Sequence, residues 1–355
     1  MRNPGYTKTF VCILGSTMLG YSTAVVARTP FATNSELKQA SPDEVRRQPA
    51  ADAQRLKIEI RPIAGSLGAE IAGVDLSKPI GDSTFADIYQ ALLDYLVIFF
   101  PRQVDLSPEQ HTAFAARFGE VDVAPFSYPF KTPTVAGHSQ ILLNVKEAAD
   151  RTINVGGFWH TDVTYRERPH KAAIIYAKDV PPFGGDTMFA NQYLAYESLS
   201  ESMKQVLGGM RAVHSSRMVY GNEAARFASV SRTQAPRPED REFSKSLHAK
   251  AEQTSAMETD HPVIRTHPDT RRKSLYVNRG FVERFAGMTA EESLPLLQHL
   301  WDHAGRPEFT CRYRWSRNDV GVWDNRCTLH YAINDYSGER REMHRISVHE
   351  EARPE

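Results

Sequence analysis

The stretch GGFWHTDVTYRERP, residues 156–169, places a histidine and an aspartate two positions apart, at His160 and Asp162. In a strand, residues i and i+2 point to the same face, so both side chains would project toward one point. A neutral imidazole and a carboxylate form a mixed nitrogen and oxygen pair that suits a borderline divalent metal. Such a pair also arises by chance, and the alternative is a polar interruption in an ordinary strand.

A third metal donor, His330, follows the strand-like segment GVWDN far downstream. Three protein ligands on one face of an octahedron leave three open positions, which is the arrangement of non-haem iron(II) oxygenases. A structural zinc site would need a fourth protein ligand, and none stands out, since Cys327 is better interpreted as a small buried hydrophobe. Together the three residues predict a metal centre with room for small molecules.

Two arginines, Arg341 and Arg345, follow with a spacing of four. On a strand they point to the same side, and the planar guanidinium matches a carboxylate or sulfonate. Two arginines in one cavity would hold two anionic groups. The alternative is a pair of exposed arginines that form ion pairs with Glu339 and Glu342, and the spacing alone favours it.

Strands must position these residues, because most strongly patterned segments alternate or are continuously apolar over short lengths. They are LKIEIRPI, AAIIYA, GDTMFAN, SLYVN, EFTCRYRW, DVGVWDN and MHRISV. Many short strands between turns, with a few helices, predict a mainly β fold of the sandwich or jelly-roll type. No G-x-G-x-x-G follows a strand, so a doubly wound α/β fold is disfavoured. Trp315 and Trp323 fall on these strands, where packing is the default role of an aromatic residue.

Three helices are expected. One has Ser107 as its N-cap and stops near Gly119, one spans 193–207, and one begins after Thr289 with a capping box. The polar stretch 220–262 has little apolar periodicity. It is interpreted as a helical insert, a lid over the site or a surface loop.

Length, charge and cysteine content bound the class of protein. The chain has 355 residues, with 43 basic and 43 acidic side chains, so the overall charge favours neither nucleic acid nor an anionic membrane. Three cysteines without framework spacing favour a reducing compartment. Residues 1–55 are predicted to form an N-terminal extension. Its first part resembles a signal peptide or an organelle presequence that is cleaved near Ala27, and the rest is expected to be a linker. Residues 56–355 are predicted to form one domain.

Several motifs together closely resemble the TauD/TfdA family of iron(II)- and 2-oxoglutarate-dependent dioxygenases. They are WHTDVTY, PPFGGDT, WDNRCTLHYAINDY and RREMHRISV, and the resemblance runs from about Leu56 to Ser347. The spacing agrees as well, because Thr187 follows His160 by 27 positions and Arg341 follows His330 by 11. The resemblance implies a double-stranded β-helix, or jelly roll.

The resemblance also implies roles for individual residues. Iron(II) would be held by His160, Asp162 and His330, while Thr187 and Arg341 would hold the distal carboxylate of 2-oxoglutarate. Arg345 falls where related enzymes present an arginine to the anionic group of the substrate or near the co-substrate, and the order of the two arginines' roles stays open. The implied reaction consumes O₂ and 2-oxoglutarate, hydroxylates a C–H bond, and releases succinate and CO₂.

The sequence departs from the taurine-specific members of the family. Those members use a histidine and a tyrosine after RFGE and an asparagine shortly before the metal histidine. Aligned without gaps, these places hold Ala124, Ser127 and Gly156, so taurine itself is not the expected substrate.

Apolar side chains are expected in the substrate pocket instead. Phe126, Val163 and Tyr165 suit a small organic anion such as an alkyl sulfonate, an alkyl sulfate or an aryloxyalkanoate. Asn154 and Tyr128 are candidates for polar contacts, with a loop position as the alternative.

Two other functions remain open from the residues. One is a zinc-dependent hydrolase that uses the same triad to activate water, and the other is a jelly roll that binds 2-oxoglutarate without catalysis. The dioxygenase chemistry predicts a cytoplasmic protein, whereas the N-terminal pattern favours an organelle matrix or export. A small anion and O₂ are the expected partners, with no nucleic acid and no membrane, and relatives often form homo-oligomers.

Overall fold

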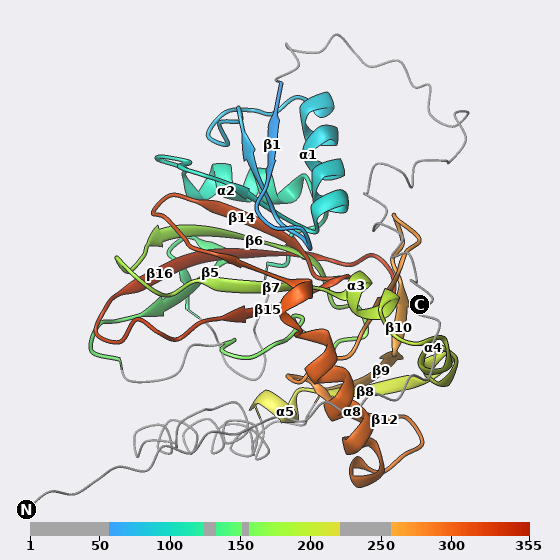
Figure 1. Ribbon diagram of the computed structural model, residues 1–355. Coiled ribbons are helices and arrows are strands. Elements are labelled where there is room, and N and C mark those ends of the chain that lie inside the picture. Colours follow the sequence, from blue (N-terminus) through green and yellow to red (C-terminus); the bar gives the residue numbers. More distant parts are fainter. Residues whose placement is uncertain (1–56, 124–132, 151–155, 221–256) are drawn as a thin grey trace, which may run out of the picture. The chain divides into compact units, whose positions relative to one another are not determined.

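The computed structural model describes residues 57–123, 133–150, 156–220 and 257–355 (Figure 1). These residues lie in the second of two compact units, Gln48–Glu355. The predicted extension, 1–55, lies outside the described residues, and its boundary stays a prediction.

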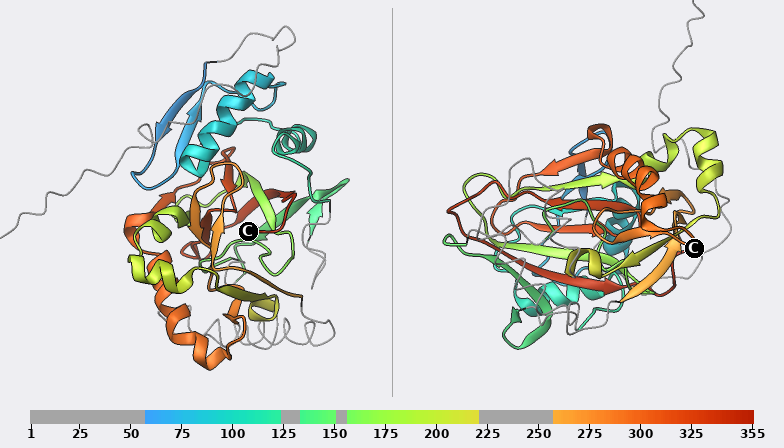
Figure 2. Two further views of the ribbon diagram at one scale, coloured as in Figure 1. Left: turned by 90° about the vertical axis from the view of Figure 1, so that its right-hand side faces the viewer. Right: turned by 90° about the horizontal axis from the view of Figure 1, so that it is seen from below.

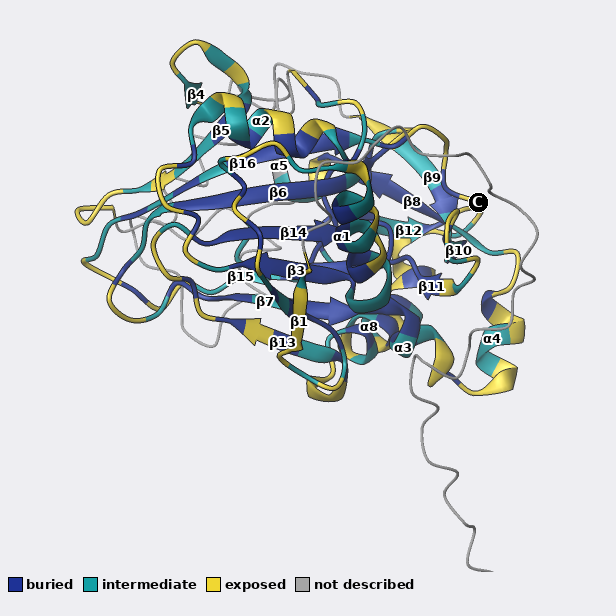
Figure 3. Cartoon of the chain, turned by 90° about the horizontal axis from the view of Figure 1, so that it is seen from above, coloured by how far each residue is buried: buried dark blue, intermediate teal, exposed yellow. Residues whose placement is uncertain are grey.

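A large sheet forms the centre of the unit. Its strands, in spatial order, are β1 (Glu59–Pro62), β2 (Ala69–Ala72), β3 (Val97–Phe100), β14 (Val320–Asp324), β6 (His170–Asp179), β16 (Arg341–His349), β5 (His138–Lys146) and β4 (Thr134–Val135). Strands β2 and β3 run parallel, and the other neighbours are antiparallel. Figure 3 shows β6 and β14 buried along most of their length, as expected for central strands covered on both faces.

A smaller sheet covers one face of the large one. It has the order β13 (Thr310–Tyr313), β7 (Thr187–Asn191) and β15 (Thr328–Ala332). Apolar side chains from both sheets fill the space between them, among them Phe99, Ile175, Phe189 and Met343. This inner layer is also where the candidate site lies.

The opposite face of the large sheet carries α1 (Asp82–Tyr95) and α2 (Pro108–Ala116) (Figure 1). Successive residues of β6 point to opposite faces of the large sheet. Ile174 packs toward these helices, and Ile175 packs toward the small sheet. This alternation follows from the period of two along a strand. The pattern fixes which side chains of each strand face the site.

A third layer lies beyond the small sheet. Its helices are α3 (Gln192–Glu197), α4 (Glu201–Leu207), α5 (Arg217–Tyr220), α8 (Ala290–Ala304) and the 3₁₀ helix η1 (Pro307–Phe309). It also contains a three-stranded sheet in the order β12 (Val282–Phe285), β8 (Arg211–Ser215) and β9 (Glu258–Pro262). A separate pair is formed by β10 (Ile264–Thr266) and β11 (Lys273–Leu275). Leu329 and Ala190, on the outer face of the small sheet, pack against this layer. Both Figure 1 and the left view of Figure 2 show α1 and α8 on opposite sides of the sheets.

The mainly β fold with added helices is confirmed. Each segment expected as a strand overlaps one in the structure, although SLYVN does so only at its first two residues. Two of the expected helices form, with capping boxes at Ser107 and Thr289. The helix expected at 193–207 is wrong as a single element. The helix is interrupted at 198–200, because the hydroxyl of Ser198 donates a hydrogen bond to the carbonyl of Leu194 and Ser200 caps a new helix.

Two further differences concern exposure and extent. Strand β1, expected to be half-buried, is exposed at every position because it is the edge strand of the large sheet. Of the polar stretch 220–262, the last residues form β9, while residues 221–256 lie outside the described part of the chain. Among the helices that the structure describes, none has the length and apolar character needed to span a bilayer.

Candidate functional site

Strand β16 presents both predicted arginines to the space between the sheets. Arg341 and Arg345 are buried on the same face as Met343, which belongs to the inner core. The pairing of these arginines with Glu339 and Glu342, which the spacing favoured, is wrong. Glu342 lies on the opposite face and forms ion pairs with Arg340 and His344.

The small sheet supplies two more of the predicted residues. Thr187 begins β7, and His330 lies in β15 directly opposite Phe189 of β7. Because Phe189 packs in the inner core, its cross-strand neighbour His330 faces the same space. Thr187 is two positions before Phe189 and shares its face.

The segment with His160 and Asp162 is not a strand, in contrast to the prediction. His160 forms an isolated bridge with His330, in which the amide of each residue donates to the carbonyl of the other. A turn follows at once, with Val163 at a positive φ of 45° and the amide of Arg166 bonded to the carbonyl of Val163. Asp162 thus lies beside His160 at the start of a turn, and not two positions along a strand.

The two histidines and the aspartate nevertheless converge. Asp162 Oδ1 lies 3.7 Å from His160 Nε2 and 3.6 Å from His330 Nε2. His160 Nδ1 lies 2.8 Å from the carbonyl oxygen of Phe158. A carbonyl can only accept, so Nδ1 carries the hydrogen and Nε2 presents its lone pair to the centre of the triad.

Burial keeps these donors in the protonation states that bind metal. Burial lowers the pKa of His160, and it lowers the pKa of His330 well below its ordinary value, with the neighbouring His160 adding to the effect. Burial alone would raise the pKa of Asp162, but the charge and hydrogen bond of Arg345 and the two neighbouring histidines together outweigh it, and the pKa falls. At neutral pH the triad therefore consists of two neutral imidazoles and one carboxylate.

Arg345 contacts the triad directly. Its guanidinium donates a hydrogen bond to Asp162 Oδ2. The other carboxylate oxygen, Oδ1, is the one closest to the two histidines. The indole of Trp323 lies 5.2 Å from the same guanidinium, and its ring centre is 4.9 Å from that of His330. Trp323 thus packs as expected and also lines the site.

Arg341 lies near Thr187 and has no carboxylate partner in the hydrogen bonds described. Its Nε donates to the carbonyl of Gly185 at 3.1 Å, two residues before Thr187. Burial lowers the pKa of Arg341, which is the response of a cation removed from water. A buried cation without an acidic partner is costly, so this position is suited to an anionic ligand.

Two residues that support this anion position were missed from the sequence. Trp315 Nε1 donates to Thr187 Oγ1 at 2.9 Å, which directs the threonine's own hydrogen elsewhere. Gly185 has a positive φ of 69°, and a β-carbon there would lie 3.2 Å from Cδ of Arg341. The GG pair in PPFGGDT was the available signal for Gly185, whereas no local signal links Trp315 to Thr187.

Apolar side chains surround the triad on the side of the turn. The rings of Phe158 and Phe281 lie 4.8 and 6.4 Å from His160, and Phe281 forms a buried cluster with Val163 and Tyr165. The other expected pocket residues, Ala124, Phe126, Ser127, Tyr128 and Asn154, lie outside the described residues. Cys327 is buried, as expected, and burial raises the pKa of its thiol.

Known proteins resemble this chain over most of its length. The family model described as taurine catabolism dioxygenase TauD, TfdA family, matches residues 59–347. The alkylsulfatase of Acinetobacter baylyi is 35% identical, over 82% of this chain and 85% of that protein. The alpha-ketoglutarate-dependent sulfate ester dioxygenase of Pseudomonas putida is 36% identical, over 82% of this chain and 90% of that protein.

A solved structure agrees with these matches. The crystal structure of a taurine dioxygenase from Burkholderia xenovorans has a TM-score of 0.64 and is 34% identical, covering 84% of this chain and 90% of that one. The match to the family model includes the residues of the triad and the two arginines. The chain therefore belongs to the TauD/TfdA family of dioxygenases.

Proposed function

We propose that the protein is an iron(II)- and 2-oxoglutarate-dependent dioxygenase that hydroxylates alkyl sulfates at the carbon bearing the ester oxygen. The observation that carries the proposal is the pair of buried arginines on one face of β16, one beside Thr187 and one beside Asp162. Two separate anion positions match a reaction that takes a dicarboxylate and an anionic substrate together. Family membership favours this reaction over the zinc hydrolase and over a non-catalytic binding protein.

The triad fits an iron ion. His160, Asp162 and His330 would hold it, because one donor atom from each converges and both imidazoles are neutral. Bound iron(II) would supply the activation of O₂ in combination with 2-oxoglutarate. Two histidines and one carboxylate are the donor set expected for that chemistry, and no thiolate of the described residues joins them.

Thr187 and Arg341 would hold the distal carboxylate of 2-oxoglutarate. The guanidinium of Arg341 offers two nitrogens that the Gly185 carbonyl does not use. The hydroxyl of Thr187 can donate to the same carboxylate, because Trp315 already supplies a donor to its oxygen. Contacts of this kind would hold the co-substrate between the sheets, away from bulk water.

Arg345 would hold the anionic group of the substrate. Because Arg345 contacts Asp162, that group would lie next to the proposed iron ligands. Phe281 and Phe158 would offer apolar contact to an alkyl chain. Hydroxylation at the carbon that bears the sulfate yields an unstable hemiacetal-like ester. Its collapse gives an aldehyde and hydrogen sulfate, with one O₂ and one 2-oxoglutarate consumed and one succinate and one CO₂ released.

The double-stranded β-helix is the corresponding proposal for the fold. It is supported by the eight-stranded and three-stranded sheets that enclose the site. A cytoplasmic location and a homo-oligomeric state remain predictions of the sequence, as does the absence of a nucleic-acid or membrane partner.

The direct test measures O₂ uptake, succinate and sulfate with hexyl sulfate, hexyl sulfonate, 2,4-dichlorophenoxyacetate and taurine. We expect equal amounts of O₂ consumed and succinate and sulfate formed with hexyl sulfate, and the weakest response with taurine. Sulfate release without O₂ uptake would identify a hydrolase instead. Binding of 2-oxoglutarate without any succinate would support the non-catalytic alternative.

Two arginine variants assign the anion positions. Arg345→Gln should raise the KM for hexyl sulfate about 10- to 100-fold, since a hydrogen bond to a charged group contributes about 1.5–3 kcal/mol. The KM for 2-oxoglutarate should change little. Arg340→Gln is the matched control, because Arg340 lies outside the site and pairs with Glu147 and Asp179. A loss that affects both substrates equally would refute the separate roles.

A further inference from the structure

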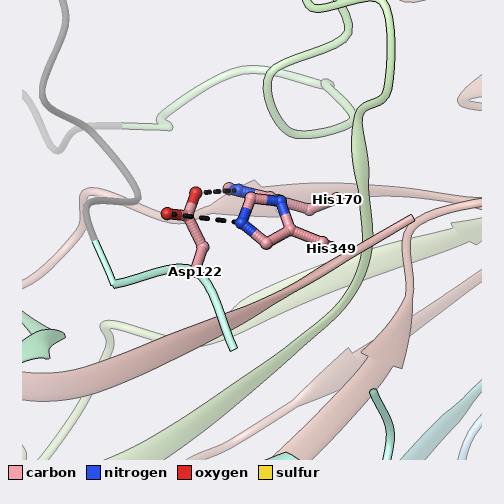
Figure 4. Close-up of side chains that lie close together, drawn as sticks. All are labelled: Asp122, His170 and His349. Atoms are coloured by element: carbon pink, nitrogen blue, oxygen red, sulfur yellow. Dashed lines mark hydrogen bonds and ion pairs between the residues drawn. The ribbon is translucent and has the colours of Figure 1, made fainter. Parts of the chain in front are cut away.

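A second group of two histidines and an aspartate lies outside the candidate active site. It consists of Asp122, His170 and His349, whose donor atoms all lie within 4.8 Å of one another. Figure 4 shows the carboxylate of Asp122 facing both imidazole rings. Asp122 Oδ2 lies 2.9 Å from His170 Nε2, and Oδ1 lies 3.7 Å from His349 Nε2.

The backbone holds the three donors together. His170 begins β6 and His349 ends β16, and the two residues are cross-strand partners in the large sheet. The amide of Asp122 donates to the carbonyl of Ser347 at 2.9 Å, and the amide of His349 donates to the carbonyl of Glu120 at 2.8 Å. These backbone hydrogen bonds hold Asp122 beside the ends of β6 and β16 and so preorganise the three donors.

Burial is graded across the group. Asp122 and His170 are buried, whereas the side chain of His349 is 36% exposed. An ion could reach the group past His349, and water could complete its coordination from that side. Three protein donors with an open side match the ligand number of an accessible metal site.

The group has the same composition as the candidate iron triad. There, Asp162 faces two histidines and accepts from Arg345 through its other oxygen. Here, Asp122 faces two histidines and accepts from Arg166, whose NH1 lies 3.0 Å from Oδ2. An arginine on the carboxylate is thus common to both groups, and it leaves Oδ1 of Asp122 facing His349.

We propose that Asp122, His170 and His349 form a second metal site, which binds a borderline divalent cation such as Zn²⁺. Two imidazoles, one carboxylate and no thiolate favour this class of ion over hard cations that prefer oxygen alone. The three donors come from separate segments. A bound ion would cross-link the stretch around Asp122 to the ends of β6 and β16 and stabilise the fold.

The test separates this site from the candidate iron triad. The full chain carrying His330→Ala is stripped of metal and equilibrated with micromolar Zn²⁺, and bound zinc is counted after gel filtration. We expect His349→Ala or His349→Gln to remove one equivalent of zinc in this background and also in the otherwise unchanged protein. His138→Ala is the matched control, because His138 is also a partly exposed strand histidine that faces a carboxylate, Glu109.

Thermal unfolding supplies a second measurement. Zn²⁺ should raise the unfolding midpoint of the His330→Ala protein, and the shift should disappear when His349 is also replaced. The proposal is overturned if the His330→Ala protein binds no zinc, if both His349 variants leave the zinc count unchanged, or if His138→Ala lowers the count as much. Loss of the zinc count with an unchanged midpoint shift would overturn it as well.

Discussion

Arg341→Met should separate ligand binding from stability. The guanidinium of Arg341 is buried and donates a hydrogen bond to the carbonyl of Gly185. Removing it loses one hydrogen bond from a charged donor, worth about 1.5–3 kcal/mol. The change also removes a buried charge, whose burial costs several kcal/mol. We therefore expect the free energy of unfolding without ligand to be unchanged or higher by up to about 3 kcal/mol.

The same substitution should severely weaken binding of 2-oxoglutarate. Two hydrogen bonds between a guanidinium and a carboxylate contribute about 1.5–3 kcal/mol each, and each 1.4 kcal/mol is tenfold in affinity. The dissociation constant should therefore rise by at least about 100-fold. Anaerobic calorimetric titration of the iron(II)-loaded protein with 2-oxoglutarate measures this directly.

Arg326→Met is the matched control for the effect on stability. Arg326 is also buried, but it forms ion pairs with Asp324 at 2.6 Å and with Asp269 at 2.8 Å. Burial alone would lower the pKa of Arg326, and Asp324 reverses the effect and raises it. Removing this arginine leaves the buried carboxylate of Asp324 without its strongest partner, so the free energy of unfolding should fall by about 3–5 kcal/mol.

Urea unfolding followed by tryptophan fluorescence compares the two variants. The reasoning is refuted if Arg341→Met destabilises the protein as much as Arg326→Met does, since Arg341 would then have a structural partner. It is also refuted if Arg341→Met leaves the affinity for 2-oxoglutarate unchanged.

Three further substitutions test the support of the site and the effect of pH. Trp315→Phe removes the hydrogen bond that orients the Thr187 hydroxyl, worth about 1 kcal/mol. It should therefore raise the KM for 2-oxoglutarate about fivefold with little change in kcat. An unchanged KM would count against that role. Gly185→Ala should lower the free energy of unfolding by about 1–2 kcal/mol, because Gly185 has a positive φ, and should also weaken 2-oxoglutarate binding by crowding Arg341; calorimetry and urea unfolding check both effects. Burial lowers the pKa of His111 to about 3, so between that value and the ordinary 6.5 only the unfolded chain binds the proton. Stability should fall as the pH falls through this window, and His111→Leu should reduce the slope by up to about 1.4 kcal/mol per pH unit, which urea unfolding at pH 6 and 5 would detect.

Strand periodicity predicted much of the site. The spacing of four between Arg341 and Arg345 places them on one face of any regular strand, and β16 is regular across that interval apart from a shift near Glu342. By the same rule His344 lies on the other face, where its Nε2 is 2.7 Å from Glu342 Oε1. Local pattern could not decide whether that face was buried, because burial depends on the small sheet that covers it.

The turn after His160 could not be predicted by periodicity. Val163 is β-branched and adopts a positive φ, a conformation that its residue type disfavours. Tertiary contacts impose it: the amide and carbonyl of His160 pair with His330, and the hydroxyl of Thr161 donates to the carbonyl of Thr328. Since these partners are far apart in sequence, a window around Val163 carries no signal for the turn.

The helix break at 198–200 was missed for a related reason. Leu194, Leu199, Met203 and Val206 have rough helical spacing, but Val206 is 58% exposed and Leu199 is buried. Leu194 belongs to α3, and Met203 and Val206 belong to α4. Leu199 lies in the break between them, so the apolar spacing does not come from one helix. The serines that flank Leu199 were the better signal, because serine competes for backbone hydrogen bonds and favours caps.

Gly156 shows how geometry changes an argument about substrate. The sequence suggested that glycine replaces an asparagine that binds the amine of taurine. In the structure, Gly156 has a positive φ of 81°, and a β-carbon there would lie 2.9 Å from Cε1 of His160. Packing against the imidazole thus accounts for the glycine without reference to any substrate. The proposal of an alkyl sulfate therefore rests on Arg345 and on the apolar rings beside His160, which are present in the structure, and not on the missing amide.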